Sequence, residues 1–249
     1  MRYVIVTGTS QGLGEAIAVQ LLEENTTVIS ISRRENKQLA KLAEQNDSNY
    51  IFHSIDLQDV HNLETHFNEV FSSIQKDNVS SIHLINNAGT LASMKPIEKS
   101  ESEQFITNVH INLIAPMILT STFMKHTKDW KVEKRIINIS SGAGKNPYFG
   151  WGAYCTTKAG VNMFTQCVAT EEVEKEYPVK TVAFAPGVVD TNMQAQIRET
   201  NKEDFINLDR FTALKEEGKL LSPEYVAKAI RNLLETENFP QGEVIRIDE

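Results

Sequence analysis

Apolar and polar positions along this chain alternate in blocks that predict strands and helices in turn. Short, nearly continuous apolar runs, typical of strands buried on both faces, lie at residues 3–7, 27–32, 50–55, 81–86, 134–140, 179–185 and 243–247. Between them, segments with one apolar helical face lie at 15–24, 35–45, 60–75, 102–126, 152–175 and 223–235. This order predicts an α/β fold, a doubly wound, seven-stranded parallel sheet with helices on both faces.

Residues 190–221 have no single dominant period, although fragments within them are helical in pattern. No linker divides the chain, so we expect a single domain of residues 1–249. We interpret the irregular segment 190–221 as a substrate lid within that domain. Ligands of parallel sheets bind beyond the carboxyl ends of the strands, which makes the polar residues there candidates for function.

The composition of the chain limits which kinds of binding partner are expected. The chain has a net charge of −8 and no basic cluster, which argues against a nucleic-acid partner. Only two cysteines occur, Cys155 and Cys167, without a pairing framework or metal-binding spacing, and this favours a reduced, cytoplasmic protein without a metal. The apolar run at the N-terminus is too short for a signal peptide or a membrane span, so we expect no membrane partner.

Tyr154 and Lys158 stand four positions apart in a predicted helix and therefore share one helical face. An ammonium beside a phenol favours the phenolate, so we expect the pKa of Tyr154 to be lowered toward the range of a proton donor at neutral pH. The same spacing is also typical of a buried aromatic beside a lysine that reaches water. The pair alone therefore does not decide between the two interpretations.

A glycine-rich turn, Gly8-x-x-x-Gly12-x-Gly14, lies between the first strand and the first helix. Gly8 permits the tight turn, Gly12 lets the backbone approach a pyrophosphate, and Gly14 allows close helix packing. Backbone N–H groups at the helix start then face the anion. The turn predicts a dinucleotide site, with an ordinary strand-to-helix turn as the alternative.

The end of the second strand indicates which dinucleotide is bound. An acid there would hold the ribose 2′-hydroxyl of NAD, but the sequence has Ser32 followed by Arg33 and Arg34. A guanidinium suits the 2′-phosphate of NADP. The sequence therefore predicts NADP(H), and the alternative is a solvated pair of arginines.

Further motifs end other predicted strands, and together they carry a family resemblance. They are Thr7-Gly8-x-x-x-Gly12-x-Gly14, Asp56, Asn86-Asn87-Ala88-Gly89, Asn112, Ser140-Ser141, Tyr154-x-x-x-Lys158 and Pro186-Gly187-x-x-x-Thr191. In this order and spacing the chain resembles the short-chain dehydrogenase/reductase superfamily over essentially its whole length. The resemblance implies a Rossmann-type fold. Gln11 departs from the pattern, since many NADP-using members carry Arg or Lys there.

The resemblance implies a catalytic tetrad of Asn112, Ser141, Tyr154 and Lys158. Tyr154 would donate a proton to a carbonyl oxygen that Ser141 hydrogen-bonds, Lys158 would stabilise the phenolate, and Asn112 would break its helix locally and hold a water. It also implies a cofactor site formed by Gly8, Ser10, Gln11, Gly12, Leu13, Gly14, Arg33, Arg34, Asp56, Leu57, Asn87, Ala88, Gly89, Tyr154, Lys158, Pro186, Gly187, Val189 and Thr191. Family members commonly dimerise through the long helices around Asn112 and Tyr154, so a homodimer is expected.

The expected walls of the substrate pocket are rich in aromatic and soft apolar residues, which favours a flat, apolar carbonyl compound. Ser141, Tyr148, Trp151 and Met193 are the candidate substrate contacts. The aromatic and soft apolar side chains of this region are Tyr148, Phe149, Trp151, Met193, Phe205 and Phe211, and about half of these are expected to pack the lid or a subunit contact instead.

Within the superfamily the pattern is similar to sepiapterin reductases and to bacterial relatives that reduce diketones such as benzil. Sepiapterin reductases carry an Asp near the C-terminus that anchors the pterin, whereas here Arg246 takes that position and Asp248 follows. We therefore expect an NADPH-dependent reductase of aromatic α-diketones, with sepiapterin reduction as the alternative. An NAD-dependent alcohol dehydrogenase and a non-catalytic, redox-sensing nucleotide binder also remain open.

Overall fold

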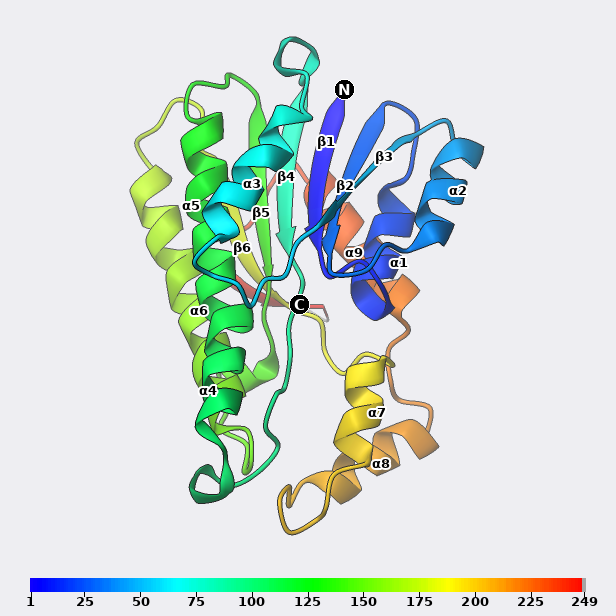
Figure 1. Ribbon diagram of the computed structural model, residues 1–249, viewed down its shortest axis with the longest axis vertical. Coiled ribbons are helices and arrows are strands. Elements are labelled where there is room, and N and C mark those ends of the chain that lie inside the picture. The colour runs from blue at the N-terminus through cyan, green and yellow to red at the C-terminus, as the bar shows by residue number, and fades with distance from the viewer. Residues whose placement is uncertain (248–249) are drawn as a thin grey trace.

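The computed structural model describes residues 1–247. Within them seven parallel strands form one sheet in the order β3-β2-β1-β4-β5-β6-β7 (Figure 1). The strands are β1 (Arg2–Thr7), β2 (Thr26–Ser32), β3 (Asn49–Ser54), β4 (Ser81–Asn86), β5 (Glu133–Ile139), β6 (Val179–Ala185) and β7 (Val244–Arg246). The apolar runs of the sequence thus predicted the strands to within a few residues. The strand order reverses between β1 and β4, and this reversal is where doubly wound sheets bind ligands.

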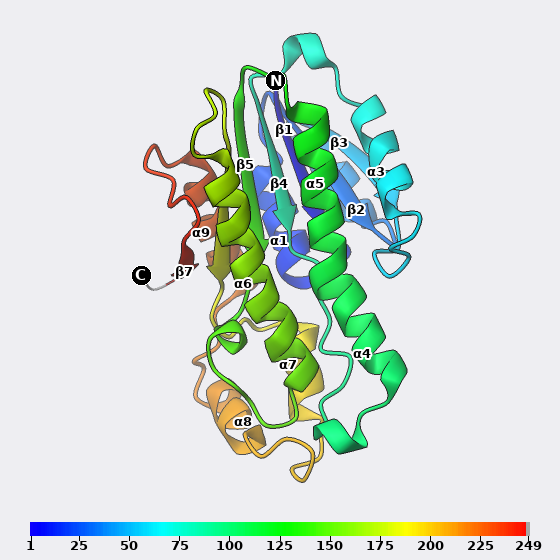
Figure 2. The ribbon, with the colours of Figure 1, turned by 90° about the vertical axis from the view of Figure 1, so that its left-hand side faces the viewer.

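Helices cover both faces of the sheet, as the alternating pattern predicts (Figures 1 and 2). On one face α1 (Gly12–Leu21), α2 (Lys37–Gln45) and α9 (Pro223–Glu235) bury Ile17, Leu39 and Ile230 against apolar side chains of the central strands. On the other face α3 (Leu63–Ser72) and α5 (Ala115–Thr127) bury Phe67 and Phe123. The long helix α6 (Gly152–Glu172) lies beside α5 and reaches down toward the lid. These two cores fix the carboxyl ends of the strands relative to one another.

The helix expected at 102–126 is interrupted. It consists of α4 (Ser102–Val109), a π-helical turn at His110–Ile114, and α5, in which the N–H of Ala115 donates to the carbonyl of His110. Pro116 has no N–H to give to the carbonyl of Asn112 four residues earlier, so the regular hydrogen-bond ladder cannot continue there. The local break expected at Asn112 is therefore present.

The same helical run, Ser102–Thr127, is apolar and long enough to cross a membrane by length and composition alone, with a mean hydropathy of 1.2 over an 18-residue stretch within it. It nevertheless packs against the sheet through Leu119 and Phe123, both fully buried. Its apolar character is therefore accounted for in part by the core of the domain.

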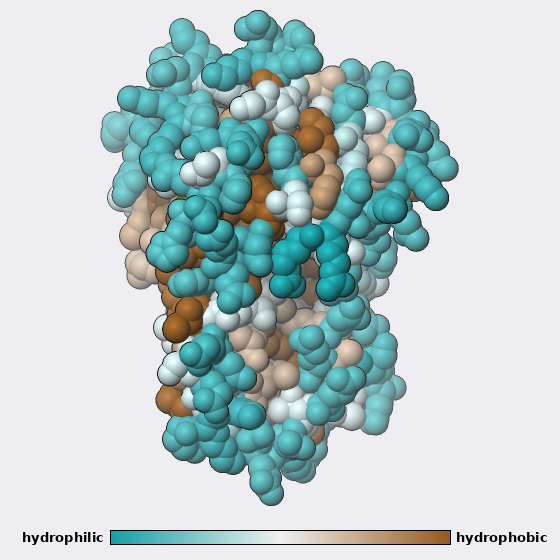
Figure 3. All heavy atoms as spheres, viewed as in Figure 1, coloured by the Kyte–Doolittle hydropathy of each residue, from teal (hydrophilic) through white to brown (hydrophobic). Residues whose placement is uncertain are grey.

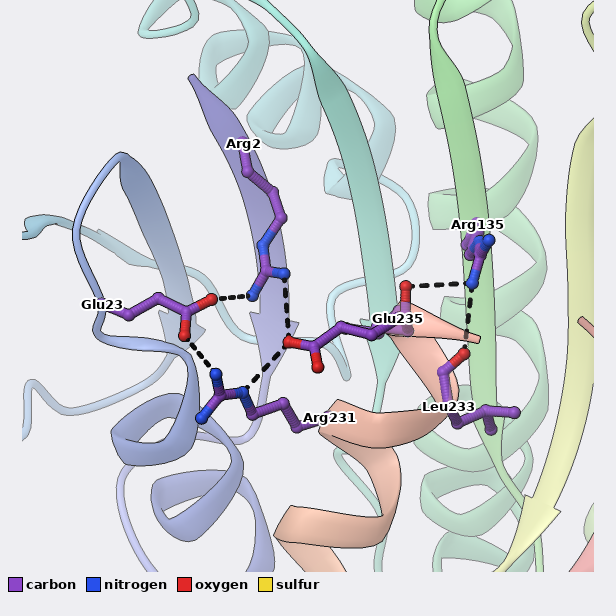
Figure 4. Close-up of polar contacts among 7 residues, drawn as sticks. Arg2, Glu23, Arg135, Arg231, Leu233 and Glu235 are labelled. Atoms are coloured by element: carbon purple, nitrogen blue, oxygen red, sulfur yellow. Dashed lines mark hydrogen bonds and ion pairs between the residues drawn. The ribbon is translucent and has the colours of Figure 1, made fainter. Parts of the chain in front are cut away.

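The amino ends of the strands carry a network of ion pairs (Figure 4). Arg2 forms an ion pair with Glu23 at 2.8 Å, and Glu23 forms a second ion pair with Arg231 at 2.6 Å. The buried Arg135 pairs with Glu133 at 2.5 Å and donates to the carbonyls of Leu233 and Leu234 at 3.3 and 2.9 Å, which fastens the last turn of α9 to β5. Burial and the nearby charges of Arg2 and Arg135 lower the pKa of His83 to about 3, so this histidine is neutral.

Two helices form the segment that shows no single period in the sequence, α7 (Asn192–Arg198) and α8 (Leu208–Glu216). They lie beyond the carboxyl ends of the strands (Figure 1). A parallel bridge between Val189 and Leu221 joins the two ends of the segment. The segment is therefore a hairpin of chain that leaves the sheet at β6 and returns at α9.

Candidate active site

The glycine-rich turn after β1 is defined by close backbone approach. A side-chain Cβ on Gly14 would lie 2.1 Å from the carbonyl oxygen of Gly8, and one on Gly8 would lie 2.9 Å from the Cα of Ala88. Asn87 braces the pair of loops, since its side-chain amide donates to the carbonyl of Thr7 at 2.9 Å. The glycine turn and the Asn-Asn-Ala-Gly run therefore lie side by side at the switch between β1 and β4.

The start of α1 fits an anion. Its N-cap residue, Gln11, makes no side-chain cap, so the first N–H groups of the helix remain available to a pyrophosphate. Gln11 instead accepts a hydrogen bond from Asn192 of α7 at 3.0 Å. A Cβ on Gly12 would lie 3.4 Å from Thr191, so the turn faces the beginning of the lid. Pro186, Gly187 and Val189 connect β6 to that same point.

The predicted phosphate-binding residues lie at the carboxyl end of β2. Arg33 and Arg34 are both exposed, and no ion pair joins either guanidinium to another of residues 1–247. Ser32 donates to the carbonyl of Arg34 at 2.7 Å and so shapes the turn that presents them. Asp56 follows β3 in an exposed position beside the buried Leu57. Ser10 is exposed in the neighbouring glycine turn.

Tyr154 and Lys158 lie together in α6, with only 8% and 4% of their surfaces exposed. The ammonium nitrogen of Lys158 is 5.7 Å from the centre of the Tyr154 ring and donates to the carbonyl of Ile139, at the end of β5, at 2.7 Å. A Cβ on Gly89 would lie 3.8 Å from that nitrogen. The pair is therefore buried at the carboxyl edge of the sheet, and the interpretation of Lys158 as a lysine that reaches water is wrong.

The pKa values of this pair differ from the sequence-based expectation. Burial raises the pKa of Tyr154 to about 12, and a hydrogen-bonding contact with Ser141 acts in the opposite direction without overcoming it. The expectation of a lowered phenol pKa is thus wrong for this site, because loss of hydration disfavours the phenolate more than its neighbours favour it. Burial also lowers the pKa of Lys158 to about 8.

The two adjacent serines have separate surroundings. Ser140 donates to the side-chain oxygen of Asn162 in α6 at 2.5 Å and is buried. Ser141 contacts Tyr154, and its hydroxyl oxygen accepts from the N–H of Ala143 at 3.1 Å, in the short 3₁₀ turn Gly142–Gly144. Only Ser141 is therefore placed beside the phenol, in agreement with the choice made from spacing.

Asn112 fastens the loop after β4. Its side-chain oxygen accepts from the N–H of Thr90 at 2.8 Å, and its amide donates to the carbonyl of Thr90 at 2.7 Å. Asn108, one helical turn earlier, donates to the carbonyl of Leu91 at 2.9 Å and accepts from the hydroxyl of Thr157 at 2.9 Å. Asn108 and Thr157 were not predicted as site residues, although the four-residue spacing of two asparagines on an otherwise apolar helix is a signal for them.

Three of the predicted substrate residues, Tyr148, Trp151 and Met193, fall into an aromatic cluster that joins α6 to residues 190–221. Trp151 stacks on Phe205 at 4.9 Å and meets the Tyr154 ring edge-on at 5.6 Å. Trp151, Phe205 and Phe211 are buried by this packing, whereas Tyr148 and Met193 are only partly buried against it. Trp151, predicted as a substrate contact, is therefore taken up by packing against Phe205 of the segment 190–221. Asp248, the carboxylate considered beside Arg246, lies outside the described residues.

The doubly wound sheet and its strand-end residues define a class, an oxidoreductase that binds a dinucleotide at the switch point. The family model for short chain dehydrogenase matches residues 2–202, and the chain belongs to that family, whose members bind NAD(P). A benzil reductase ((S)-benzoin forming) of Bacillus cereus is 89% identical over 100% of both chains. A sepiapterin reductase of Meriones unguiculatus is 30% identical over 96% of this chain and 93% of that protein. A solved short chain dehydrogenase/reductase from Saccharomyces cerevisiae superposes with a TM-score of 0.85 at 27% identity, covering 100% of this chain and 97% of that one.

The buried pair predicts the pH dependence of carbonyl reduction. Tyr154, with a pKa of about 12, keeps its proton throughout the neutral range, whereas Lys158, with a pKa of about 8, loses its charge first as the pH rises. The turnover rate for reduction should therefore be flat below pH 8 and fall above it. Initial rates at saturating cofactor and substrate, from about pH 6 to about pH 10, check this. In Lys158→Arg, whose charge persists, the fall should move to higher pH; an unchanged alkaline limb would contradict the assignment.

Proposed function

We propose that this protein reduces benzil and related aromatic α-diketones to α-hydroxyketones with NADPH. The observation that carries the proposal is the 89% identity, over the full length, to a protein named as a benzil reductase. The site supports it, because a buried Tyr–Lys pair, a serine hydroxyl and an apolar, aromatic wall lie together at the carboxyl edge of the sheet.

In the proposed mechanism the bound cofactor supplies a hydride to the carbonyl carbon. Tyr154 donates the proton to the carbonyl oxygen, and its high pKa keeps that proton available at neutral pH. The Ser141 hydroxyl donates a hydrogen bond to the same oxygen and stabilises the charge that develops there. Lys158, held by the carbonyl of Ile139, stabilises the phenolate that remains.

Asn112 has a supporting part in this proposal. The Asn112 side chain is hydrogen-bonded to Thr90. Its main-chain carbonyl receives no hydrogen bond from Pro116, four residues later, because proline has no N–H. That carbonyl is suited to bind a water that returns protons toward Lys158. The π-helical turn at His110–Ile114 is the local geometry that supports this assignment.

We further propose that NADP(H) is the preferred cofactor. The glycine turn with Ser10, Gln11 and Leu13 would hold the pyrophosphate, and Asp56 and Leu57 would contact the adenine. Asn87, Ala88 and Gly89 would lie against the ribose. The nicotinamide would be held by Pro186, Gly187, Val189 and Thr191. The exposed Arg33, at the end of β2, would bind the 2′-phosphate, with Arg34 as a neighbour. Residues 190–221 would act as the lid over the substrate, with Tyr148 and Met193 facing it.

Sepiapterin reduction is the second candidate, and the relative at 30% identity favours it. Against it stands Arg246, a cation at the position where the resemblance implies a pterin-anchoring carboxylate. A direct comparison of turnover with benzil and with sepiapterin, both with NADPH, separates the candidates. The diketone assignment requires the higher kcat/KM with benzil.

We also propose that the protein is cytoplasmic and forms a homodimer. Ile106, Met117 and Met163 are exposed on α4, α5 and α6, and Figure 3 shows apolar surface along the side of the molecule where α4 and α5 run. A patch of this kind is typical of an interface between subunits. Cys155 and Cys167 are both free thiols, which fits a reducing compartment.

Tyr154→Phe should abolish most of the benzil reduction. The substitution removes the only proton-donating atom of the ring and should lower kcat by a factor of about 100 or more. NADPH affinity, measured by fluorescence titration, should change by less than about threefold, because the phenyl ring remains and the other residues of the proposed dinucleotide site are unchanged. Tyr177→Phe, at an exposed tyrosine beyond α6, is the matched control and should match the wild type. Near wild-type turnover in Tyr154→Phe would exclude this tyrosine as the acid.

Arg33→Ala should raise the KM for NADPH about tenfold or more and leave the KM for NADH nearly unchanged, because only NADPH carries the 2′-phosphate. Arg34→Ala is the paired control and tests whether the second arginine contributes. Equal effects of Arg33→Ala on both cofactors would contradict the proposed phosphate contact.

Met117→Glu should dissociate the dimer, because a carboxylate would be buried in an apolar contact. Sedimentation velocity at several protein concentrations measures the change in mass. Tyr225→Glu, at an exposed tyrosine of α9 on the opposite face of the sheet, should leave the dimer intact. A wild-type protein that sediments as a monomer would refute the dimer.

A further inference from the structure

Arg246, the last residue of β7, lies beside the loop that carries Ser141. Its side-chain nitrogen Nη2 is 3.9 Å from the position that a Cβ on Gly142 would occupy. Gly142 follows Ser141 directly, and the next N–H along the chain, that of Ala143, donates to the Ser141 hydroxyl. The guanidinium therefore lies beside Gly142, the residue that directly follows the serine in contact with Tyr154.

The alternation of side chains along β7 explains this direction. Ile245 and Ile247 pack into the core on the α9 side of the sheet. Successive side chains of a strand point to opposite faces, so Arg246 points to the face that carries α6 and the Ser141 loop. Arg246 pairs in register with Ala185, which places it at the carboxyl edge of the sheet, level with the start of the Pro186–Gly187 turn.

Arg246 differs from the other strand-borne arginines in its partners. Arg2 and Arg135, at the amino ends of the strands, are paired with glutamates, whereas no hydrogen bond or ion pair joins Arg246 to any other of residues 1–247. Its side chain is exposed, so its donors are accessible from the solvent side of the Ser141 loop. A guanidinium presents five N–H donors and binds oxygen acceptors in a fixed planar geometry.

We propose that Arg246 is a specificity-determining residue that recognises the oxygen on the carbon next to the reacting carbonyl, and so selects 1,2-dicarbonyl compounds over simple ketones. This inference rests on the proposed carbonyl reductase function. Tyr154 and Ser141 serve the oxygen of the carbonyl that is reduced, and the adjacent oxygen needs a donor of its own. Reduction adds a hydride to one carbonyl carbon and a proton to the oxygen of that carbonyl. The second C=O bond stays intact, and Arg246 only donates hydrogen bonds to its oxygen.

A charged donor toward that second oxygen gives selectivity by a known physical route. A site built to hydrogen-bond a substrate oxygen discriminates against an analogue that lacks it, because the donor then loses its partner. Charge assistance makes this contact stronger than one between neutral groups. The aromatic side of the site, around Tyr148 and Met193, is left to hold the apolar part of the substrate.

The test compares two activated ketones that differ in the second oxygen, 1-phenyl-1,2-propanedione and 2,2,2-trifluoroacetophenone. Arg246→Met, which keeps the length of the side chain but not its donors, should lower kcat/KM for the diketone about tenfold or more. It should leave the value for trifluoroacetophenone within about twofold. Arg246→Lys, which keeps the charge but loses the planar fork, should fall between Arg246→Met and the wild type with the diketone.

The outcomes separate this inference from the function on which it rests. Equal losses with both ketones, or no loss with either, would overturn the role of Arg246 while the diketone reductase function stands. A wild-type protein that reduces trifluoroacetophenone but no diketone would overturn the proposed function, and the inference with it. The NADPH dissociation constant and the melting temperature of each variant, both expected to match the wild type, exclude a loss of fold as the cause.

Discussion

The site depends on one buried charge, the ammonium of Lys158, which is held by a backbone carbonyl rather than by an acid. Only 4% of Lys158 is exposed, and its ammonium donates a hydrogen bond to the carbonyl of Ile139 at the end of β5. A buried cation without an acidic partner is costly, and its lowered pKa reflects that cost. Such a group persists only where surrounding packing fixes it. Here the sheet fixes Ile139, the close contacts of Gly89 close the other side, and α6 carries the lysine.

The polar groups around this charge are arranged on two sides of α6. On one side Ser140 binds Asn162 and thereby leaves Ser141 to face Tyr154. On the other side Thr157 and Asn108 connect α6 to the helix of Asn112, which in turn holds the loop at Thr90. These hydrogen bonds satisfy buried side chains and also set positions, since they connect α6 to the end of β5 and to α4, and connect the helix of Asn112 to the loop after β4. A change in any of them would therefore shift the phenol or the loop that covers it.

Much of the fold could be predicted because buried parallel strands appear as continuous apolar runs, and because the glycine turn and the Tyr154–Lys158 pair each lie on one short stretch of chain. Ser141 lies on a different element from Tyr154, and only the spacing of the family's motifs indicates it. The rest depends on contacts between distant segments. The π-helical turn shifts hydrogen bonds without disturbing the apolar period, and Pro116 is its only local signal. The direction of the Tyr154 pKa depends on how far α6 is buried, which the Tyr–Lys spacing does not contain. Likewise the chain between α7 and α8 packs on α6 through the stacking of Phe205 on Trp151, residues 54 apart in number.

The arginines at the two edges of the sheet differ in their partners within residues 1–247. At the amino edge of the sheet Arg2, Arg135 and Arg231 are matched by glutamates and by the carbonyls that end α9, so that this edge is locally neutral. At the carboxyl edge, within residues 1–247, Arg33 and Arg246 join no ion pair, and Lys158 has only a carbonyl. In a chain of net charge −8, these cations at the carboxyl ends of the strands are candidates to bind oxygen atoms of a ligand. That edge is also where the strand order reverses and the start of α1 points, and all three features favour a ligand that carries oxygen and negative charge.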